Sequence, residues 1–174
     1  GTLFKVAWSV IKGFGDNPKY LGAKAGMISI LHTWGQNLSL HPHLHCIVPA
    51  GGVTEKGKWK HAPKGDGFLF PVKEMSKVFR AQFVAELRKN GIKDKPLFDA
   101  LFSKNWVIYA KKPFKTASSV VEYLGRYTHK IAISNHRIVH ADNEYVTFRA
   151  KNYRKNGQSE LLKLKTKEFI RRFS

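Results

Sequence analysis

Several segments of this sequence carry apolar residues at helical spacing, and short strand-like runs lie between and after them. Leu3–Phe14 and Met75–Leu87 repeat apolar side chains at intervals of three and four, which predicts two amphipathic helices. A shorter helix is expected over Pro96–Phe102, and Thr116 is expected to cap a helix that runs through Tyr127. Strands are expected at Met27–Trp34, His43–Val48, Trp106–Ala110, Ile131–Ser134, Tyr145–Ala150 and Leu161–Leu164, with a small exposed hairpin at Thr54–Lys60. Helices combined with a largely antiparallel set of strands predict an α+β fold.

The length and composition favour one folded domain. A chain of 174 residues is long enough to bury roughly 70% of its unfolded surface in one core. Hydrophobic residues make up 43% of the chain, which is too many for a disordered protein. Because the sequence shows no internal repeat, low-complexity segment or Pro-, Gly- and Ser-rich linker, we expect a single domain over residues 1–174.

The charge is strongly positive, with 31 Lys and Arg against 12 Asp and Glu and a formal net charge of +19. Such self-repulsion points to an anionic partner, and nucleic acid is the first candidate. Cationic side chains, Arg137 among them, are expected to contact the nucleic-acid backbone, with Trp34, Trp59 or Trp106 available to stack on bases.

Other classes are disfavoured by what the sequence lacks. No run approaches the roughly 18 consecutive apolar residues of a membrane-spanning helix, and no signal peptide opens the chain. We therefore expect a soluble, intracellular protein. Cys46 is the single cysteine, which excludes an intrachain disulfide and a cysteine-based zinc knuckle within this segment.

The segment His43-Leu44-His45 is the first candidate metal site. Side chains alternate along a strand, so the two imidazoles project from the same face. Two neutral imidazoles side by side form half of a divalent-cation site and leave positions open for other ligands. The alternative is a pair of surface histidines with no ligand.

A third ligand is expected close by in the sequence. Gln36 lies seven residues before His43, and in a hairpin its side-chain oxygen would converge on the histidines. His41 competes for this role, although Pro42 disfavours a continuous strand through His41.

Tyr123 and Tyr127 are the candidate nucleophiles. Their spacing of four places both phenols on one face of the predicted helix. The alternative is that both rings pack in the core. Because Arg126, His129 and Lys130 surround them with cationic or titratable groups, which favour the phenolate, we prefer the catalytic interpretation.

These motifs resemble those of a known family. His43-Leu-His-Cys-Ile-Val-Pro-Ala-Gly-Gly52, Tyr123-Leu-Gly-Arg-Tyr-Thr-His-Lys-Ile-Ala-Ile-Ser-Asn-His136 and Leu31-His-Thr-Trp-Gly-Gln36 are similar to segments of two-tyrosine transposases of rolling-circle insertion sequences. These are the insertion-sequence-ninety-one group of the HUH endonuclease superfamily, named for its histidine-hydrophobic-histidine pattern. The resemblance covers roughly Leu3 to Phe173.

The resemblance implies a ferredoxin-like or RRM-like antiparallel sheet with helices packed against it. It also implies Mg²⁺ or Mn²⁺ on His43, His45 and Gln36, and nicking and transfer of single-stranded or hairpin DNA at transposon ends. Tyr123 or Tyr127 would form a 5′-phosphotyrosine, while Arg126, His129, Lys130 and Arg137 would bind DNA or stabilise charge. A cytoplasmic, nucleoid-associated protein of a prokaryote is expected.

One departure from the family pattern stands out. Full-length members have a cysteine-rich zinc-binding region at the N-terminus and further C-terminal sequence, so this chain is expected to be a catalytic core without them. A replication initiator or a relaxase would use the same chemistry. An alternative of another class is a non-catalytic module that binds single-stranded nucleic acid, in which the tyrosines pack in the core.

Overall fold

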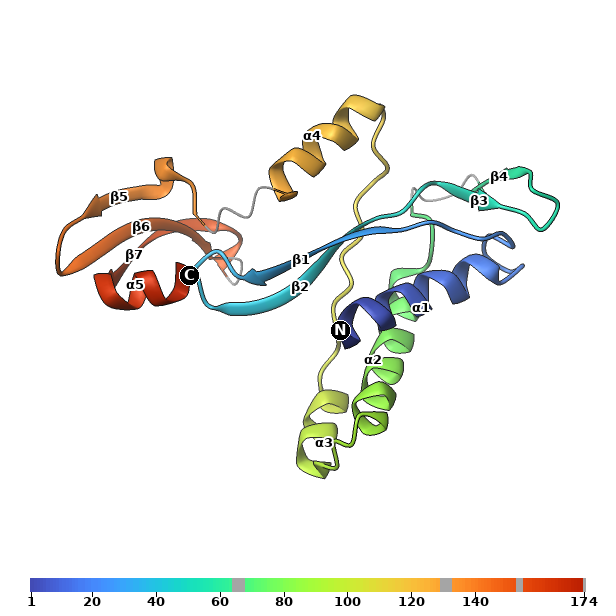
Figure 1. Cartoon of the computed structure of the whole chain (residues 1–174), viewed down its shortest axis with the longest axis horizontal. Coiled ribbons are helices and arrows are strands. Elements are labelled where there is room, and N and C mark those ends of the chain that lie inside the picture. Colours follow the sequence, from blue (N-terminus) through green and yellow to red (C-terminus); the bar gives the residue numbers. More distant parts are fainter. Residues whose placement is uncertain (64–67, 129–132, 153–154, 174) are drawn as a thin grey trace. The chain divides into compact units, whose positions relative to one another are not determined.

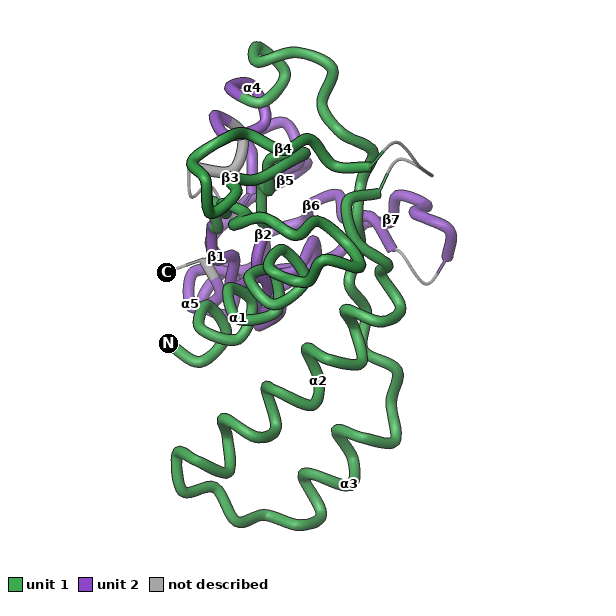
Figure 2. The backbone as a smooth tube through the Cα atoms, turned by 90° about the vertical axis from the view of Figure 1, so that its right-hand side faces the viewer, with its two compact units in different colours: residues 1–29, 46–120 green, residues 30–45, 121–174 purple. Residues whose placement is uncertain are grey.

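The computed structural model describes residues 1–63, 68–128, 133–152 and 155–173, except the side chains of residues 126–128 and 173. The chain forms two compact units, each built from two stretches of sequence (Figure 1, Figure 2). Unit 1 comprises Gly1–Ser29 and Cys46–Val120, and unit 2 comprises Ile30–His45 and Val121–Ser174. The expectation of a single domain stays a prediction.

Unit 1 is mainly helical. It contains α1 (Thr2–Asp16), α2 (Val72–Lys89), α3 (Lys95–Ser103) and a hairpin of β3 (Gly51–Val53) and β4 (Trp59–His61). Apolar residues of α1 at helical spacing, including Val6, Val10 and Phe14, are buried in its core. The Asp94 side chain caps α3 by accepting a hydrogen bond from the backbone N–H of Leu97 at 2.8 Å. The predicted helices of this unit are therefore confirmed.

Unit 2 contains most of the strands. Most of β1 (Ile28–Trp34) and β2 (Leu40–Ile47) belongs to this unit, and the two strands form a hairpin. A second sheet is antiparallel and consists of β5 (Ile138–Ala141), β6 (Tyr145–Asn152) and β7 (Gln158–Lys165). The helices are α4 (Ala117–Thr128), which begins in unit 1, and α5 (Thr166–Phe173), with a short 3₁₀ turn, η1 (Asn135–Arg137). A connection of five residues joins β1 to β2, which is too short for a parallel crossover.

The core of unit 2 forms where the β1–β2 turn meets the three-stranded sheet. Val146, Phe148 and Ala150 alternate along β6 and are buried, as a one-sided strand requires. Leu38 in the turn packs into the same core at 2% exposure, although its φ is +60°. A side chain at positive φ is strained, so burial of Leu38 and the backbone hydrogen bonds between Gly35 and Ser39 and between Leu38 and Gly35 together hold this turn shape.

The α+β class with antiparallel sheets is confirmed. Among the described residues the strands lie in three sheets of two, two and three strands instead of one central sheet. The pairs β1–β2, β3–β4, β5–β6 and β6–β7 all join strands that follow one another in the sequence. Each sheet is therefore a local hairpin or meander, and the described residues show no single central sheet.

Three predictions about strands were wrong. Trp106–Ala110 is irregular, because the Trp106 carbonyl accepts a hydrogen bond from the Ser76 hydroxyl and its indole N–H binds the Leu101 carbonyl. Pro42 does not interrupt β2, which starts at Leu40. Ser134 is irregular and leads into η1, whereas residues 131–132 of that expected strand lie outside the described residues.

None of the helices in the described part of the chain is both long enough and apolar enough to span a lipid bilayer.

Candidate active site

Three histidines from two strands meet in unit 2. His43 and His45 lie on the same face of β2, as predicted, and their Nε2 atoms are 3.2 Å apart. His32 of β1 joins them, with its ring centroid 4.5 Å from that of His45 and 5.5 Å from that of His43. All three side chains are half-buried, and one nitrogen of each lies within 4.8 Å of the others.

This cluster fits a divalent metal. Three imidazole nitrogens on a two-stranded hairpin could supply three ligands and leave the remaining positions for substrate oxygens or water. His32 was missed as a ligand in the sequence because its approach depends on how β1 pairs with β2. The sequence feature that could have identified His32 is its position in the segment Leu31–Gln36, on the strand expected to pair with the strand of His43 and His45.

The backbone of β2 sets the proton position on His43. Its Nδ1 lies 2.7 Å from the His41 carbonyl oxygen, which only accepts hydrogen bonds. Nδ1 of His43 therefore donates to this carbonyl, and Nε2 is the ring nitrogen that faces the cluster. His41 thus contributes its carbonyl, and its ring centroid is 5.1 Å from that of His43.

Gln36 lies in the turn between β1 and β2 and is exposed. Its backbone carbonyl accepts a hydrogen bond from the Arg137 guanidinium at 2.5 Å. The structure does not test whether its side-chain oxygen binds a metal, so that role stays a prediction.

Tyr123 places a phenol beside the histidines. Its hydroxyl is 2.9 Å from Nδ1 of His45, and the two residues are 78 positions apart in the sequence. The side chain is half-buried on α4, a helix that begins after Thr116, whose hydroxyl accepts a hydrogen bond from the Ser119 N–H. The phenol therefore points to a polar group that can take or give a proton, which argues against a role limited to core packing.

The remaining candidates divide into two groups. The side chains of Tyr127 and Arg126 lie outside the described residues, as do His129 and Lys130. Arg137 is described, and besides the Gln36 carbonyl its Nε donates to the carbonyl of Arg149 at 2.8 Å. It connects the β1–β2 turn to β6 within unit 2.

Replacing Arg137 with alanine is expected to destabilise unit 2 by about 1–2 kcal/mol, because two backbone carbonyls lose a charged donor. Urea unfolding followed by circular dichroism measures this loss. Arg149→Ala is the matched control, since it removes the same charge from an exposed side chain and leaves its own carbonyl in place. Equal stability of the two variants would show that the Arg137 bonds contribute nothing, and would leave its predicted DNA contact as its role.

Comparisons with known proteins agree with these motifs. Residues 26–174 match a family model, Y2_Tnp, described as "Putative transposase". The chain is 40% identical over 190 residues to "Putative transposase y4qJ" of Sinorhizobium fredii, an alignment that covers 99% of this chain and 48% of the relative. It is 30% identical over 137 residues to "Transposase for insertion sequence element IS801" of Pseudomonas savastanoi pv. phaseolicola, which covers 72% of this chain and 33% of that relative. The chain thus spans half or less of the length of these relatives, and no solved structure matches it significantly.

Proposed function

Because this chain belongs to the Y2_Tnp transposase family, we propose that it nicks single-stranded or hairpin DNA at transposon ends and transfers the cut strand. Tyr123 is the nucleophile, and His32, His43 and His45 hold a divalent metal. The observation that supports this most is the 2.9 Å approach of the Tyr123 hydroxyl to a histidine of the cluster. A non-catalytic binding module would not require a phenol beside a histidine cluster.

Three imidazole nitrogens favour Mn²⁺ over Mg²⁺, because Mg²⁺ prefers oxygen ligands. When bound, the metal would polarise a non-bridging oxygen of the scissile phosphate and stabilise the charge that develops in the transition state. Gln36 remains a candidate for a further oxygen ligand.

The proton on His45 links the histidines to the nucleophile. When Nε2 of His45 serves as a ligand, its proton lies on Nδ1, which then donates to the Tyr123 oxygen 2.9 Å away. A donor at this distance stabilises the phenolate form of Tyr123. An unperturbed phenol has a pKa near 10, so only a small fraction of it is ionised at neutral pH. The phenol proton leaves to solvent.

The Tyr123 oxygen then attacks phosphorus. A tyrosine–phosphorus bond forms, the bond from phosphorus to the 3′ oxygen breaks, and that oxygen takes a proton to become a 3′-hydroxyl. The 5′ end stays on Tyr123 as a phosphotyrosine, so rejoining needs no nucleotide cofactor. Attack by a 3′-hydroxyl on this linkage restores a phosphodiester and releases Tyr123. Tyr127, one helical turn away in sequence, would hold a second strand during exchange.

Such an enzyme would act on the DNA of a prokaryotic cell, in the cytoplasm and at the nucleoid. Arg126, His129 and Lys130 follow Tyr123 in the sequence and would contact the DNA backbone or offset the charge of the phenolate.

The test is an incubation of the chain with single-stranded oligonucleotides that carry the element ends, in the presence of Mn²⁺ or Mg²⁺. We expect a covalent protein–DNA adduct on a denaturing gel, and its loss when a chelator is added. Salt-dependent binding to a verified end without any adduct would replace this proposal with the single-stranded nucleic-acid-binding module.

A further inference from the structure

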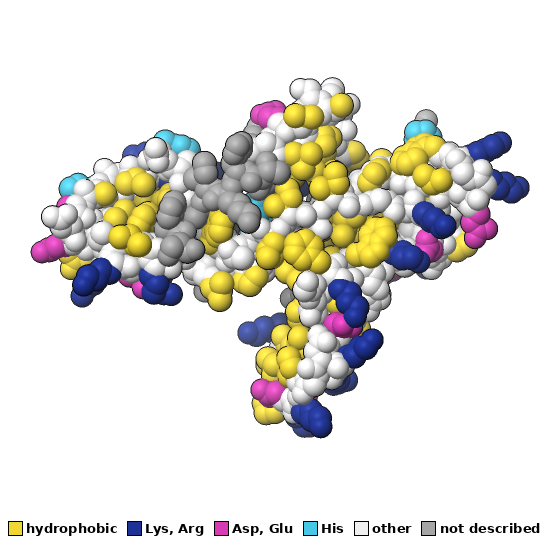
Figure 3. Space-filling model, in the orientation of Figure 1, with side chains coloured by type: hydrophobic (Ala, Val, Ile, Leu, Met, Phe, Trp, Pro, Cys, Tyr) yellow, Lys and Arg dark blue, Asp and Glu magenta, His cyan; other side chains and the backbone are white. Residues whose placement is uncertain are grey.

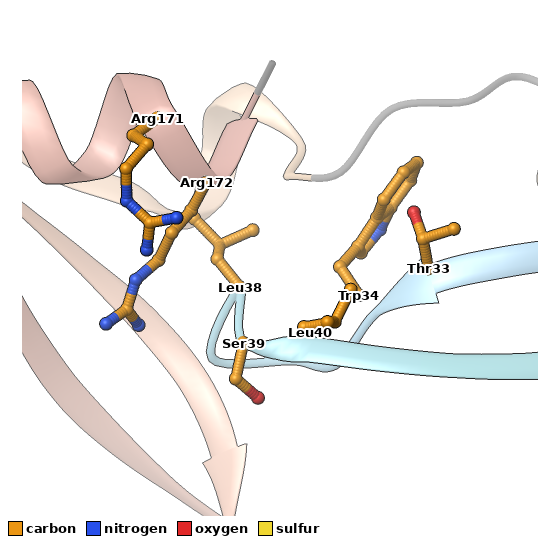
Figure 4. A pocket seen from close by; sticks show the side chains of 7 residues that line it. All are labelled: Thr33, Trp34, Leu38, Ser39, Leu40, Arg171 and Arg172. Carbon is orange, nitrogen blue, oxygen red and sulfur yellow. The ribbon is translucent and has the colours of Figure 1, made fainter.

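Unit 2 contains a cavity of about 390 Å³ between the end of the β1–β2 hairpin and α5. The hairpin supplies most of its lining and α5 supplies two arginines, as Figure 4 shows: Thr33, Trp34, Leu38, Ser39, Leu40, Arg171 and Arg172. This volume lies within the roughly 300–1,000 Å³ of small-ligand sites. A single nucleotide is therefore a suitable occupant, whereas a duplex is not.

Trp34 connects the cavity to the histidine cluster. His32 and Trp34 are two residues apart on β1 and so lie on one face of the strand. Their rings stack, with centroids 6.1 Å apart and planes inclined by 18°. Trp34 lines the cavity and stacks on His32, one of the proposed metal ligands, so the cavity lies next to the metal site. The nucleotides beside a scissile phosphate bound at that site would pass through this region.

The arginines give the cavity a positive side. Glu168 accepts hydrogen bonds from Arg171 at 2.7 Å and from Nε of Arg172 at 2.6 Å, and these bonds lower the pKa of Glu168 to about 2. One carboxylate thus orients two guanidinium groups and leaves a net positive charge. Arg172 donates to Glu168 through its Nε, and its terminal nitrogens are the groups that can donate to a phosphate.

On the face that Figure 3 shows, Lys and Arg side chains lie on several separate elements of the chain. An aromatic ring and two guanidinium groups line this one cavity, and such groups together bind single-stranded nucleic acid through base stacking and phosphate contacts.

We propose that this cavity is a subsite for one unpaired nucleotide that flanks the scissile phosphate, with its base against Trp34 and its phosphate on Arg172. This inference rests on the proposed function, because it takes the single DNA strand as the substrate. Thr33 and Ser39 add hydroxyl groups to the lining that can bind the edge of a base or a sugar.

Photochemical cross-linking tests the position of the base. A single-stranded oligonucleotide of about 15 nucleotides carries 5-iodouracil, which joins to an aromatic ring stacked on it when irradiated. The wild-type chain is irradiated with this probe in chelator, digested and analysed by mass spectrometry. We expect a cross-link at Trp34. Cross-links that map only outside the cavity lining would overturn the proposal.

Binding affinity provides a second readout. Trp34→Ala is expected to weaken binding of the same oligonucleotide about 5- to 100-fold, measured by fluorescence anisotropy. Trp8→Ala, which removes another partly exposed indole on α1, is the matched control and is expected to change affinity less than about twofold. Since Trp34 also packs on the core of unit 2, Trp34→Leu keeps apolar volume there without a ring. Wild-type affinity in a folded Trp34→Leu variant would disprove stacking.

The arginine is tested against a cation of the same helix. Arg172→Gln and Lys167→Gln each remove one positive charge from α5, but Lys167 does not line this cavity. We expect Arg172→Gln to weaken binding at least about fivefold more than Lys167→Gln at high salt, where nonspecific attraction is screened. Equal losses would show that only net charge matters.

These measurements need no metal and no cleavage, so the two proposals fail separately. An adduct that forms normally while Trp34 and Arg172 prove dispensable overturns the subsite alone. A cross-link at Trp34 without any metal-dependent adduct would show that the cavity binds a nucleotide of single-stranded DNA, but it would overturn the proposed nicking reaction and with it the position of that nucleotide beside a scissile phosphate.

Discussion

Replacing Tyr123 with phenylalanine is expected to lower the rate of adduct formation on single-stranded element ends by at least roughly 1,000-fold. The change removes only the hydroxyl that lies 2.9 Å from Nδ1 of His45, so the ring packing of α4 is retained. The rate is measured from the covalent product on denaturing gels under single-turnover conditions with Mn²⁺. Metal binding should be unaffected, since Tyr123 is not among the proposed ligands.

Two variants serve as controls for that loss. Tyr109→Phe makes the same change at a tyrosine that is 80% exposed in unit 1, and it should form adduct at the wild-type rate. Tyr127→Phe, alone and combined with Tyr123→Phe, separates the two phenols. Undiminished adduct in Tyr123→Phe together with its loss in Tyr127→Phe would reassign the attacking group to Tyr127.

Replacing His32 with alanine is expected to weaken Mn²⁺ binding by about 100-fold or more, because one of three nitrogen ligands is lost. His43→Ala and His45→Ala should produce losses of similar size, and adduct formation should fall with them. Isothermal titration calorimetry on the DNA-free chain measures the affinity directly. The readout is therefore independent of whether the fragment cleaves DNA.

The matched comparison is Gln36→Ala, which tests the ligand expected from the sequence. Gln36 is exposed in the turn, whereas His32 lies half-buried among the other histidines. A change of less than about threefold is expected for Gln36→Ala in the DNA-free chain. His61→Ala, at an exposed histidine of β4, checks that removing any histidine does not have the same effect. If Gln36→Ala weakens binding as much as His43→Ala while His32→Ala does not, His32 is not the third ligand.

Local sequence patterns were sufficient for the elements whose residues contact their own neighbours. The helical spacing of apolar residues in α1 and α2 is a property of consecutive turns, and alternation along β2 placed His43 and His45 on one face. Thr116 likewise caps α4 through a bond to a residue three positions away. These predictions depended on geometry within one element, so they held.

Strand propensity was a weaker guide. Trp106–Ala110 has the residues of a strand, yet Val107 and Tyr109 are 87% and 80% exposed and the segment is irregular. A strand needs a partner, and in this segment the Trp106 carbonyl binds a side chain of α2 instead. Conversely, the sequence did not predict β5, because a segment of four residues is too short to show a clear alternation of apolar and polar residues. This strand forms because it pairs with β6.

The sequence by itself determined the chemical groups of the site: two histidines at a spacing of two, two tyrosines at a spacing of four and a large excess of positive charge. Only the tertiary structure decided which groups meet. His32 reaches His43 and His45 through the pairing of β1 with β2, and Tyr123 reaches His45 across 78 positions of sequence. The periodicity of apolar residues indicates which side chains share a face of one helix or strand. Contacts between elements depend instead on strand pairing and core packing, and the packing of Leu38 from the β1–β2 turn into the core of unit 2 is an example.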